Sequence, residues 1–185
     1  MPDWAWIIIV AAAVLIVLAV AAIYMRSRRS RSLQERFGSE YERTVEEEGG
    51  RRGAERELAE RERQRERLDI IPLAPEARDR YGESWRTVQT RFVDDPAGAV
   101  GEADRLVTDV MRERGYPIDD FVQRAADISV DHPDVVENYR AGHALYLKED
   151  RGEAGTENLR QAFVHYRALF SELLETREDA VQEVR

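Results

Sequence analysis

The residues best able to do chemistry in this chain are grouped in the run Asp131-His132-Pro133-Asp134. Two carboxylates around one imidazole can act as general acid and base, or can hold a divalent cation. The same run also suits the start of a helix, because Asp caps helix N-termini and Pro favours the first helical position. We favour helix entry here, and a metal-binding or enzymatic use of His132 is the alternative.

Other carboxylates and histidines allow the same two interpretations. The doublets Asp94-Asp95 and Asp119-Asp120 could serve as an acid/base pair or bind a hard cation. Both stand where a helix is expected to begin, so capping explains them more simply. His143 falls on the apolar face of its expected helix, where we favour a hydrogen-bonded core residue over a ligand or proton switch.

Established catalytic motifs are absent from the sequence. It contains no GxSxG elbow, no Walker A loop, no GxGxxG and no HExxH. None of the 3 histidines follows a Glu by three residues, as the ligands of di-iron bundles do. The chain has no cysteine, which excludes disulfides, thiolate metal sites and a cysteine nucleophile. We therefore expect no enzymatic activity and no cofactor.

The elements that would position these residues are helices, and residues 73–185 are predicted to form an acidic bundle of about five. Tyr81, Trp85, Val88 and Phe92 recur at helical spacing on one face. Four further helix starts are indicated by capping residues and prolines, at Asp95-Pro96, Asp119 or Asp120, His132-Pro133 and Thr156. Amphipathic helices with short connections pack as a compact all-α bundle.

Residues 26–72 are predicted to form a basic cluster followed by a charged helical linker. An apolar stripe at steps of four runs through residues 32–48, and Ser39 and Glu42 have the spacing of a capping box. Residues 54–67 are rich in Glu–Arg pairs, and only Leu58 offers an apolar seam. We favour a solvated linker helix there over a coiled-coil stalk, which needs sustained heptads.

Residues 4–25 are predicted to be a transmembrane helix. Trp4 to Met25 contains no charge, and 22 helical residues reach roughly 33 Å, enough for a hydrocarbon core of about 30 Å. Trp4, Trp6 and Tyr24 mark the two interfaces. A cleaved signal peptide is less favoured, because no basic residue precedes the apolar run.

The flanks of this segment predict its orientation. Residues 1–3 hold no basic residue, whereas Arg26, Arg28, Arg29 and Arg31 follow the apolar run. Positive flanks stay in the cytoplasm, so we expect an inner-membrane protein with its N-terminus outside and its body inside. The arginines can also bind anionic lipid headgroups. The net charge of −9 disfavours a nucleic-acid partner.

Several runs across residues 35–175 carry a resemblance to a known group of proteins. They are RFGSEYERTVEEEGGRRGAERELAERE, FVDDPAGAVGEADRLVTDVM, RGYPIDDF and SVDHPDVVENYR. Together with the apolar segment, they resemble a family of small bacterial single-pass membrane proteins, usually described as hypothetical membrane or secreted proteins. The resemblance implies a bacterial inner-membrane setting, and it implies no activity and no functional residue.

The function that we expect is a membrane-anchored interaction or adaptor module at the cytoplasmic face, with an unidentified protein partner. Aromatic and charged side chains are the candidates for its contact surface. They are Trp85, Asp94, Asp95, His132 and Tyr139. A self-associating structural membrane protein is the main alternative, and an enzymatic or metal-binding bundle that uses Asp131, His132, Asp134 or His143 is the third.

Overall fold

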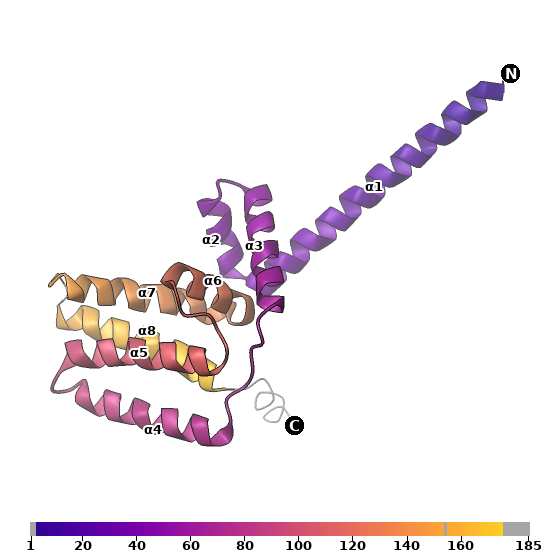
Figure 1. The fold of residues 1–185 in the computed structure, drawn as a ribbon. Helices are drawn as coiled ribbons and strands as arrows, with labels where there is room; N and C mark the ends of the chain where they lie inside the picture. The colour runs from indigo at the N-terminus through magenta and orange to yellow at the C-terminus, as the bar shows by residue number, and fades with distance from the viewer. Residues whose placement is uncertain (1–2, 154, 176–185) are drawn as a thin grey trace, which may run out of the picture.

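A computed structural model shows an all-helical chain (Figure 1), as the sequence predicts. The structure describes residues 3–153 and 155–175, and the side chains of residues 3–13, 22 and 26 lie outside this description. Within it there are eight helices: α1 (Asp3–Phe37), α2 (Ser39–Glu47), α3 (Arg51–Glu66), α4 (Pro75–Arg91), α5 (Pro96–Glu113), α6 (Phe121–Asp131), α7 (Pro133–Asp150) and α8 (Thr156–Leu174).

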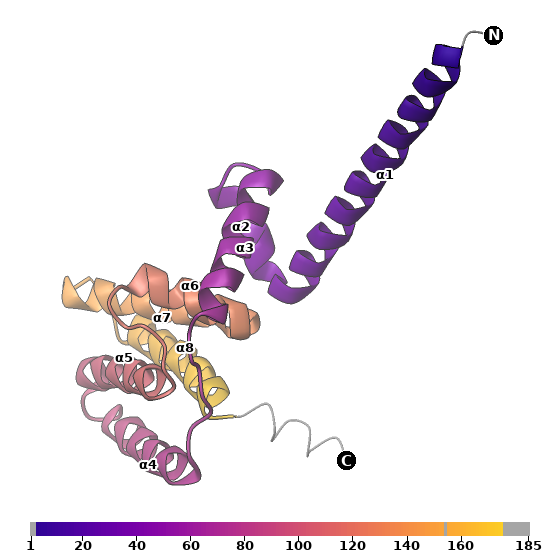
Figure 2. The same ribbon diagram turned by 45° about the vertical axis from the view of Figure 1, so that its right-hand side comes forward.

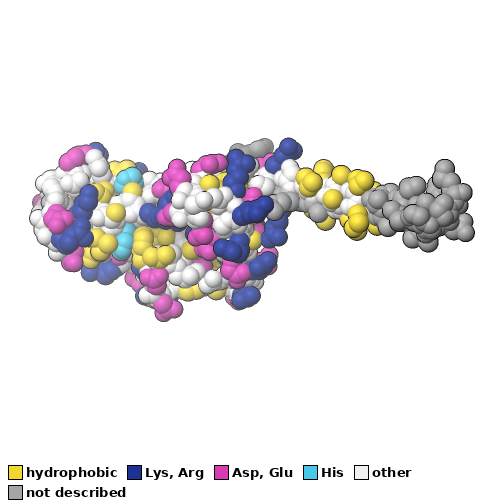
Figure 3. Space-filling view, turned by 90° about the horizontal axis from the view of Figure 1, so that it is seen from above, with side chains coloured by type: hydrophobic (Ala, Val, Ile, Leu, Met, Phe, Trp, Pro, Cys, Tyr) yellow, Lys and Arg dark blue, Asp and Glu magenta, His cyan; other side chains and the backbone are white. Residues whose placement is uncertain are grey.

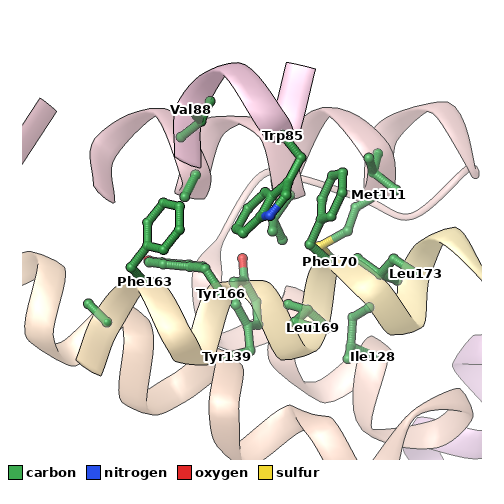
Figure 4. Packing of buried hydrophobic residues seen from close by; sticks show 14 of the residues in the cluster. Trp85, Val88, Met111, Ile128, Tyr139, Phe163, Tyr166, Leu169, Phe170 and Leu173 are labelled. Atoms are coloured by element: carbon green, nitrogen blue, oxygen red, sulfur yellow. The ribbon is translucent and has the colours of Figure 1, made fainter. Parts of the chain in front are cut away.

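Helices α4 to α8 form the predicted bundle. Helix α8 lies between α7 and α5, α4 covers the outer side of α5, and α6 lies along α7 (Figures 1 and 2). Aromatic side chains fill the space between α4 and α8, where Trp85 stacks on Phe163 at 5.1 Å and on Phe170 at 4.5 Å between ring centroids (Figure 4). The periodic apolar positions of the sequence are therefore the core of the bundle.

The helix starts in the bundle follow local capping chemistry. Asp95 accepts a hydrogen bond from Gly98 N at 3.0 Å, and Asp120 accepts one from Gln123 N at 3.1 Å, so both doublets cap helices as expected. Helix α7 begins at Pro133, but His132 makes no capping hydrogen bond with its side chain. The expected cap at Thr156 is wrong, because Gly155 is the N-cap of α8.

Helices α2 and α3 form a hairpin that packs on α6 and α7. The expected solvated linker is not found, because Leu58 is 0% exposed and belongs to a second small core with Leu33, Phe37, Tyr41 and Val130. Tertiary packing therefore decides the state of α3, whose polar composition alone indicated an exposed helix. Helix α2 starts at Ser39 as predicted, but its N-cap is Gly38, which has φ of 49° and no capping side chain.

Helix α1 leaves the body as a single long arm (Figures 1 and 2). Its C-terminal end is buried, with Phe37 at 0% exposure. The large apolar side chains described between Val14 and Met25 are 52% to 69% exposed. They make no core contact with the body.

The predicted transmembrane segment has a different outcome from the bundle. Among the residues that the structure describes, no helix combines the length and the apolar character of a membrane crossing. The structure therefore does not support a span over Trp4–Met25. The described apolar side chains begin at Val14, and a crossing needs about 20 consecutive apolar residues. Trp4, Trp6 and the other side chains before Val14 lie outside the described residues.

Candidate functional site

The run Asp131 to Asp134 does not assemble into one site. Asp131 accepts hydrogen bonds from Tyr116 Oη, at 2.8 Å, and from Arg65. His132 Nδ1 lies 2.8 Å from Glu172 Oε1, and Asp134 is exposed in the first turn of α7. Across residues 3–153 and 155–175, no group of three or more His, Asp or Glu side chains could hold a metal ion. Asp131 and His132 have separate structural partners, and Asp134 faces solvent.

His132 is a largely buried residue at the junction of α6 and α7. Burial lowers its pKa, and this effect exceeds the opposite influence of the hydrogen bond with Glu172. Its Nε2 atom is buried without a hydrogen-bond partner among the described residues. The imidazole is therefore neutral at pH 7, and it holds the junction rather than facing a substrate.

A second polar group lies inside the bundle, between α5, α7 and α8. Tyr166 donates a hydrogen bond to Asp104 Oδ1 at 2.8 Å. His143 Nδ1 stands 3.8 Å from the same oxygen, too far for a hydrogen bond, and its ring stacks on Phe121 at 3.7 Å. Burial alone would raise the pKa of Asp104, but the contacts with His143 and Tyr166 outweigh it and hold that pKa below its usual value.

This group combines a carboxylate, an imidazole and a phenol, which are also the parts of an acid/base site. Its geometry serves packing, because the Asp104 carboxylate is satisfied by Tyr166 and the His143 ring is covered by Phe121. Burial raises the pKa of Tyr166, so its hydroxyl stays protonated as a donor. The group therefore packs three helices together, but the hydrogen bond expected of His143 is not found, because its Nδ1 is buried without a partner among the described residues.

The five residues expected on a contact surface are dispersed. Trp85 is 7% exposed within the aromatic stack, and Tyr139 is 0% exposed. Asp95 caps α5 with a side chain that is still 46% exposed, His132 is largely buried, and Asp94 is exposed. Neither aromatic ring is available to a partner in this structure.

The most strongly organised charged site joins the hairpin to the bundle, and it was not foreseen from the sequence. Glu40 of α2 is 0% exposed, yet its carboxylate accepts three hydrogen bonds from two arginines. Arg140 of α7 reaches both of its oxygens, at 2.6 and 2.7 Å, and Arg61 of α3 reaches Oε1 at 2.7 Å. A carboxylate buried without such partners would be strongly unfavourable.

The position of Glu40 in the sequence does contain one local signal. Phe37, Glu40, Tyr41 and Thr44 follow the spacing i, i+3, i+4, i+7, which places the carboxylate on the apolar face of its helical segment. That spacing predicts burial, but not the partners. Arg140 is 100 residues away, and only the packing of α2 on α7 brings it to Glu40.

The arm α1 carries the remaining predicted residues. Tyr24 is 65% exposed, and Arg28, Arg29 and Arg31 are exposed directly after the apolar side chains. The side chains of Trp4, Trp6 and Arg26 lie outside the described residues. The exposed apolar side chains of α1, followed directly by exposed arginines, are thus the most unusual surface among the described residues.

Comparison of the chain with known protein families, with curated proteins and with solved structures finds no match.

Proposed function

We propose that this chain is a membrane-tethered helical module whose body binds a protein partner close to the membrane surface. One observation carries the proposal: the arm exposes nine large hydrophobic side chains along one uninterrupted helix. They are Val14, Leu15, Ile16, Val17, Leu18, Val20, Ile23, Tyr24 and Met25. A soluble surface rarely exposes a contiguous apolar area of this kind, so another apolar phase or molecule covers it.

A lipid bilayer fits the arm better than water does. The uncharged run from Trp4 to Met25 has the length of a hydrocarbon core, and interfacial aromatic residues stand near both of its ends. The arginines that follow it favour an orientation in which α1 is anchored in a bacterial inner membrane. The body is then in the cytoplasm, and residues 1–3 are on the other side. This orientation would present the bundle to cytoplasmic partners.

A binding role suits the body better than an enzymatic one. The side chains best able to do chemistry, Asp131, His132 and Asp104, are used in contacts between helices. The exposed faces of the bundle carry many charges, which suits recognition of a partner by complementary charge. The partner itself is to be found by experiment.

The same apolar arm favours a second function, self-association. Arms from several copies can cover one another, either in the bilayer or in water. The mass of the full-length protein in mild detergent separates the two, because a module that binds other proteins is monomeric there, whereas a structural assembly is not.

The membrane tether is tested first, with the full-length protein in bacterial cells. We expect it in the membrane fraction and resistant to alkaline carbonate, which removes peripheral proteins. Sidedness is read with single cysteines at two exposed positions, Ser39→Cys and Gln89→Cys, in this cysteine-free chain. Protection of both from an impermeant maleimide until lysis supports a cytoplasmic body. Labelling before lysis, or release by carbonate, contradicts the proposal.

The binding role needs its own control. Residues 1–31 joined to an unrelated soluble helical bundle give a matched bait with the same arm and arginines. Proteins that crosslink to the full-length chain in cells, and not to this chimera, are partners of the body. If the two baits enrich the same proteins, the body has no specific partner and the adaptor role is lost.

A further inference from the structure

We propose that the two grooves between α1 and α3 bind the phosphate headgroups of anionic phospholipids. This inference rests on the membrane tether proposed above, and it names the ligand of the basic region. The grooves have volumes of about 420 and 520 Å³ and lie on the two sides of the contact between α1 and α3. Their lining contains six arginines: Arg29, Arg31, Arg51, Arg52, Arg56 and Arg63.

The charge of the grooves is opposite to that of the whole chain. Glu55 is the single carboxylate in either lining, and it accepts a hydrogen bond from Tyr41 Oη at 3.4 Å. Arg63 pairs with the exposed Glu60 at 3.0 Å. Of the groove arginines, the other five have no carboxylate within 4.0 Å among the described residues. In a chain with net charge −9, such unpaired arginines form a strongly positive local surface.

The fold creates this surface by packing two helices side by side. Arg52, Arg56 and Arg63 share one face of α3, and Ala59 between them is small enough to let α1 approach. On α1, Arg29 follows Met25 by one helical turn on the same face. Leu58 of α3 and the end of α1 are held in one small core, so the two sets of arginines keep their relative positions.

The apolar arm selects among possible anions. Met25 and Ile23 line the grooves, and they are also among the last of the exposed apolar side chains of α1, at 65% and 69% exposure. A ligand here meets arginines and an apolar surface at once. Figure 3 shows basic side chains gathered where the apolar part of α1 meets the body. An anionic phospholipid, with acyl chains along α1 and its phosphate against guanidinium groups, matches both surfaces.

The chemistry of the donors fits phosphate in particular. Guanidinium groups bind phosphate oxygens through paired hydrogen bonds. Arg51 begins α3, and the N-cap Gly50 supplies no capping side chain. The positive end of the helix dipole at this groove adds to the attraction. A zwitterionic headgroup carries its own cation, which the arginines repel, so we expect preference for phosphatidylglycerol over phosphatidylcholine.

The test uses the full-length protein in vesicles of phosphatidylcholine, alone or mixed with phosphatidylglycerol. The lipid that stays with the protein after mild detergent extraction is measured by native mass spectrometry. We expect the natural chain to retain phosphatidylglycerol selectively. A variant with Arg52→Gln, Arg56→Gln and Arg63→Gln loses about fivefold in preference for each arginine replaced.

A matched control has the same loss of charge elsewhere. Arg86→Gln, Arg105→Gln and Arg167→Gln change three exposed arginines of the bundle and should leave the lipid preference unchanged. Equal thermal unfolding of the two triple variants shows that both are folded. An equal loss of preference in both variants, or none in the first, would overturn the headgroup site.

Two further experiments distinguish failure of the headgroup site from failure of the membrane tether. Flotation with vesicles of phosphatidylcholine alone tests the membrane tether in the absence of an anionic headgroup. The Arg52, Arg56 and Arg63 variant should float there as the natural chain does. Flotation without a lipid preference overturns this inference and leaves the tether standing, whereas absence of flotation overturns both. If inorganic phosphate at the same concentration displaces the lipid, the grooves bind phosphate itself and the assignment to a lipid is wrong.

Discussion

The α4–α8 bundle and the α1–α3 region are stabilised by different physics. The bundle buries a continuous apolar core, with Trp85 stacked between Phe163 and Phe170. The α2–α3 hairpin buries a much smaller core and adds the ion pairs of Glu40. Apolar burial is non-directional and tolerates small shifts, whereas ion pairs in a buried site depend on each partner.

The two regions also use their charged side chains differently. In the bundle, carboxylates and imidazoles such as Asp104 and His132 are used between helices. Around α1 and α3, arginines such as Arg52 and Arg56 face grooves beside an exposed apolar arm. The bundle thus uses its buried polar groups for packing, whereas the α1–α3 region leaves arginines open to solvent beside an apolar surface.

The largest effect is expected in the core of the bundle. Phe170→Ala removes a ring that is 3% exposed and stacks on Trp85, and it should lower the free energy of unfolding by about 3–5 kcal/mol. Urea unfolding of the full-length chain in mild detergent measures this loss. Val164→Ala, on the same helix but 51% exposed, is the control and should cost less than about 0.5 kcal/mol. Similar losses in both variants would contradict the location of the core.

The next effect concerns the attachment of the hairpin. Glu40→Gln leaves Arg61 and Arg140 without their shared carboxylate, and it should weaken docking by about 2–3 kcal/mol. The cost is below that of a fully buried pair, because these arginine side chains are still 12% and 17% exposed. Hydrogen exchange should therefore accelerate in α2 and α3 and stay slow in α5 and α8.

A matched control for Glu40 lies on α7. Glu137 is 49% exposed and also pairs with Arg140, at 3.2 Å. Glu137→Gln should change docking by less than about 1 kcal/mol, as exposed pairs do. Loss of protection in the bundle together with the hairpin would show that the two regions unfold as one unit.

A smaller effect tests the carboxylate doublet as a cap. Asp95→Ala removes the hydrogen bond to Gly98 N and should destabilise the bundle by about 1 kcal/mol. Asp94→Ala changes the exposed neighbour, and its effect should stay within about 0.5 kcal/mol. The difference in urea midpoint between the two variants is the measurement. A larger effect from Asp94 would indicate a role beyond capping.

The smallest effect is a dependence on pH. Burial holds the pKa of His132 below its usual value of about 6.5, so below pH 6.5 the unfolded chain takes up a proton before the folded chain does. Its contribution to stability is complete above pH 6.5 and falls as the pH decreases toward the folded pKa. In the His132→Gln variant, the free energy of unfolding should lack this part of its dependence on pH. His165→Gln, which changes a histidine paired with Asn138, should retain this dependence.

Local chemistry explains why much of the bundle is predictable from the sequence. A cap such as Asp95 acts on an amide three residues away, and the apolar stripe that includes Trp85 repeats with the helical period. These interactions are contained within one helix, so residue order is sufficient to place them. The cap expected at Thr156 is wrong because Thr156 is already the first residue of α8, and the N–H of the N-cap Gly155 donates to Asn158 Oδ1.

The contacts between different helices could not be predicted from such local patterns. The sequence by itself determined the all-helical class, the absence of cysteine chemistry, two of the capping residues and the succession of apolar and basic segments in residues 4–31. Only the tertiary structure decided that Glu40 meets Arg61 and Arg140, and that arginines of α3 lie beside those of α1. The reason is range, since helical periodicity fixes which residues share a face, whereas packing decides which faces meet.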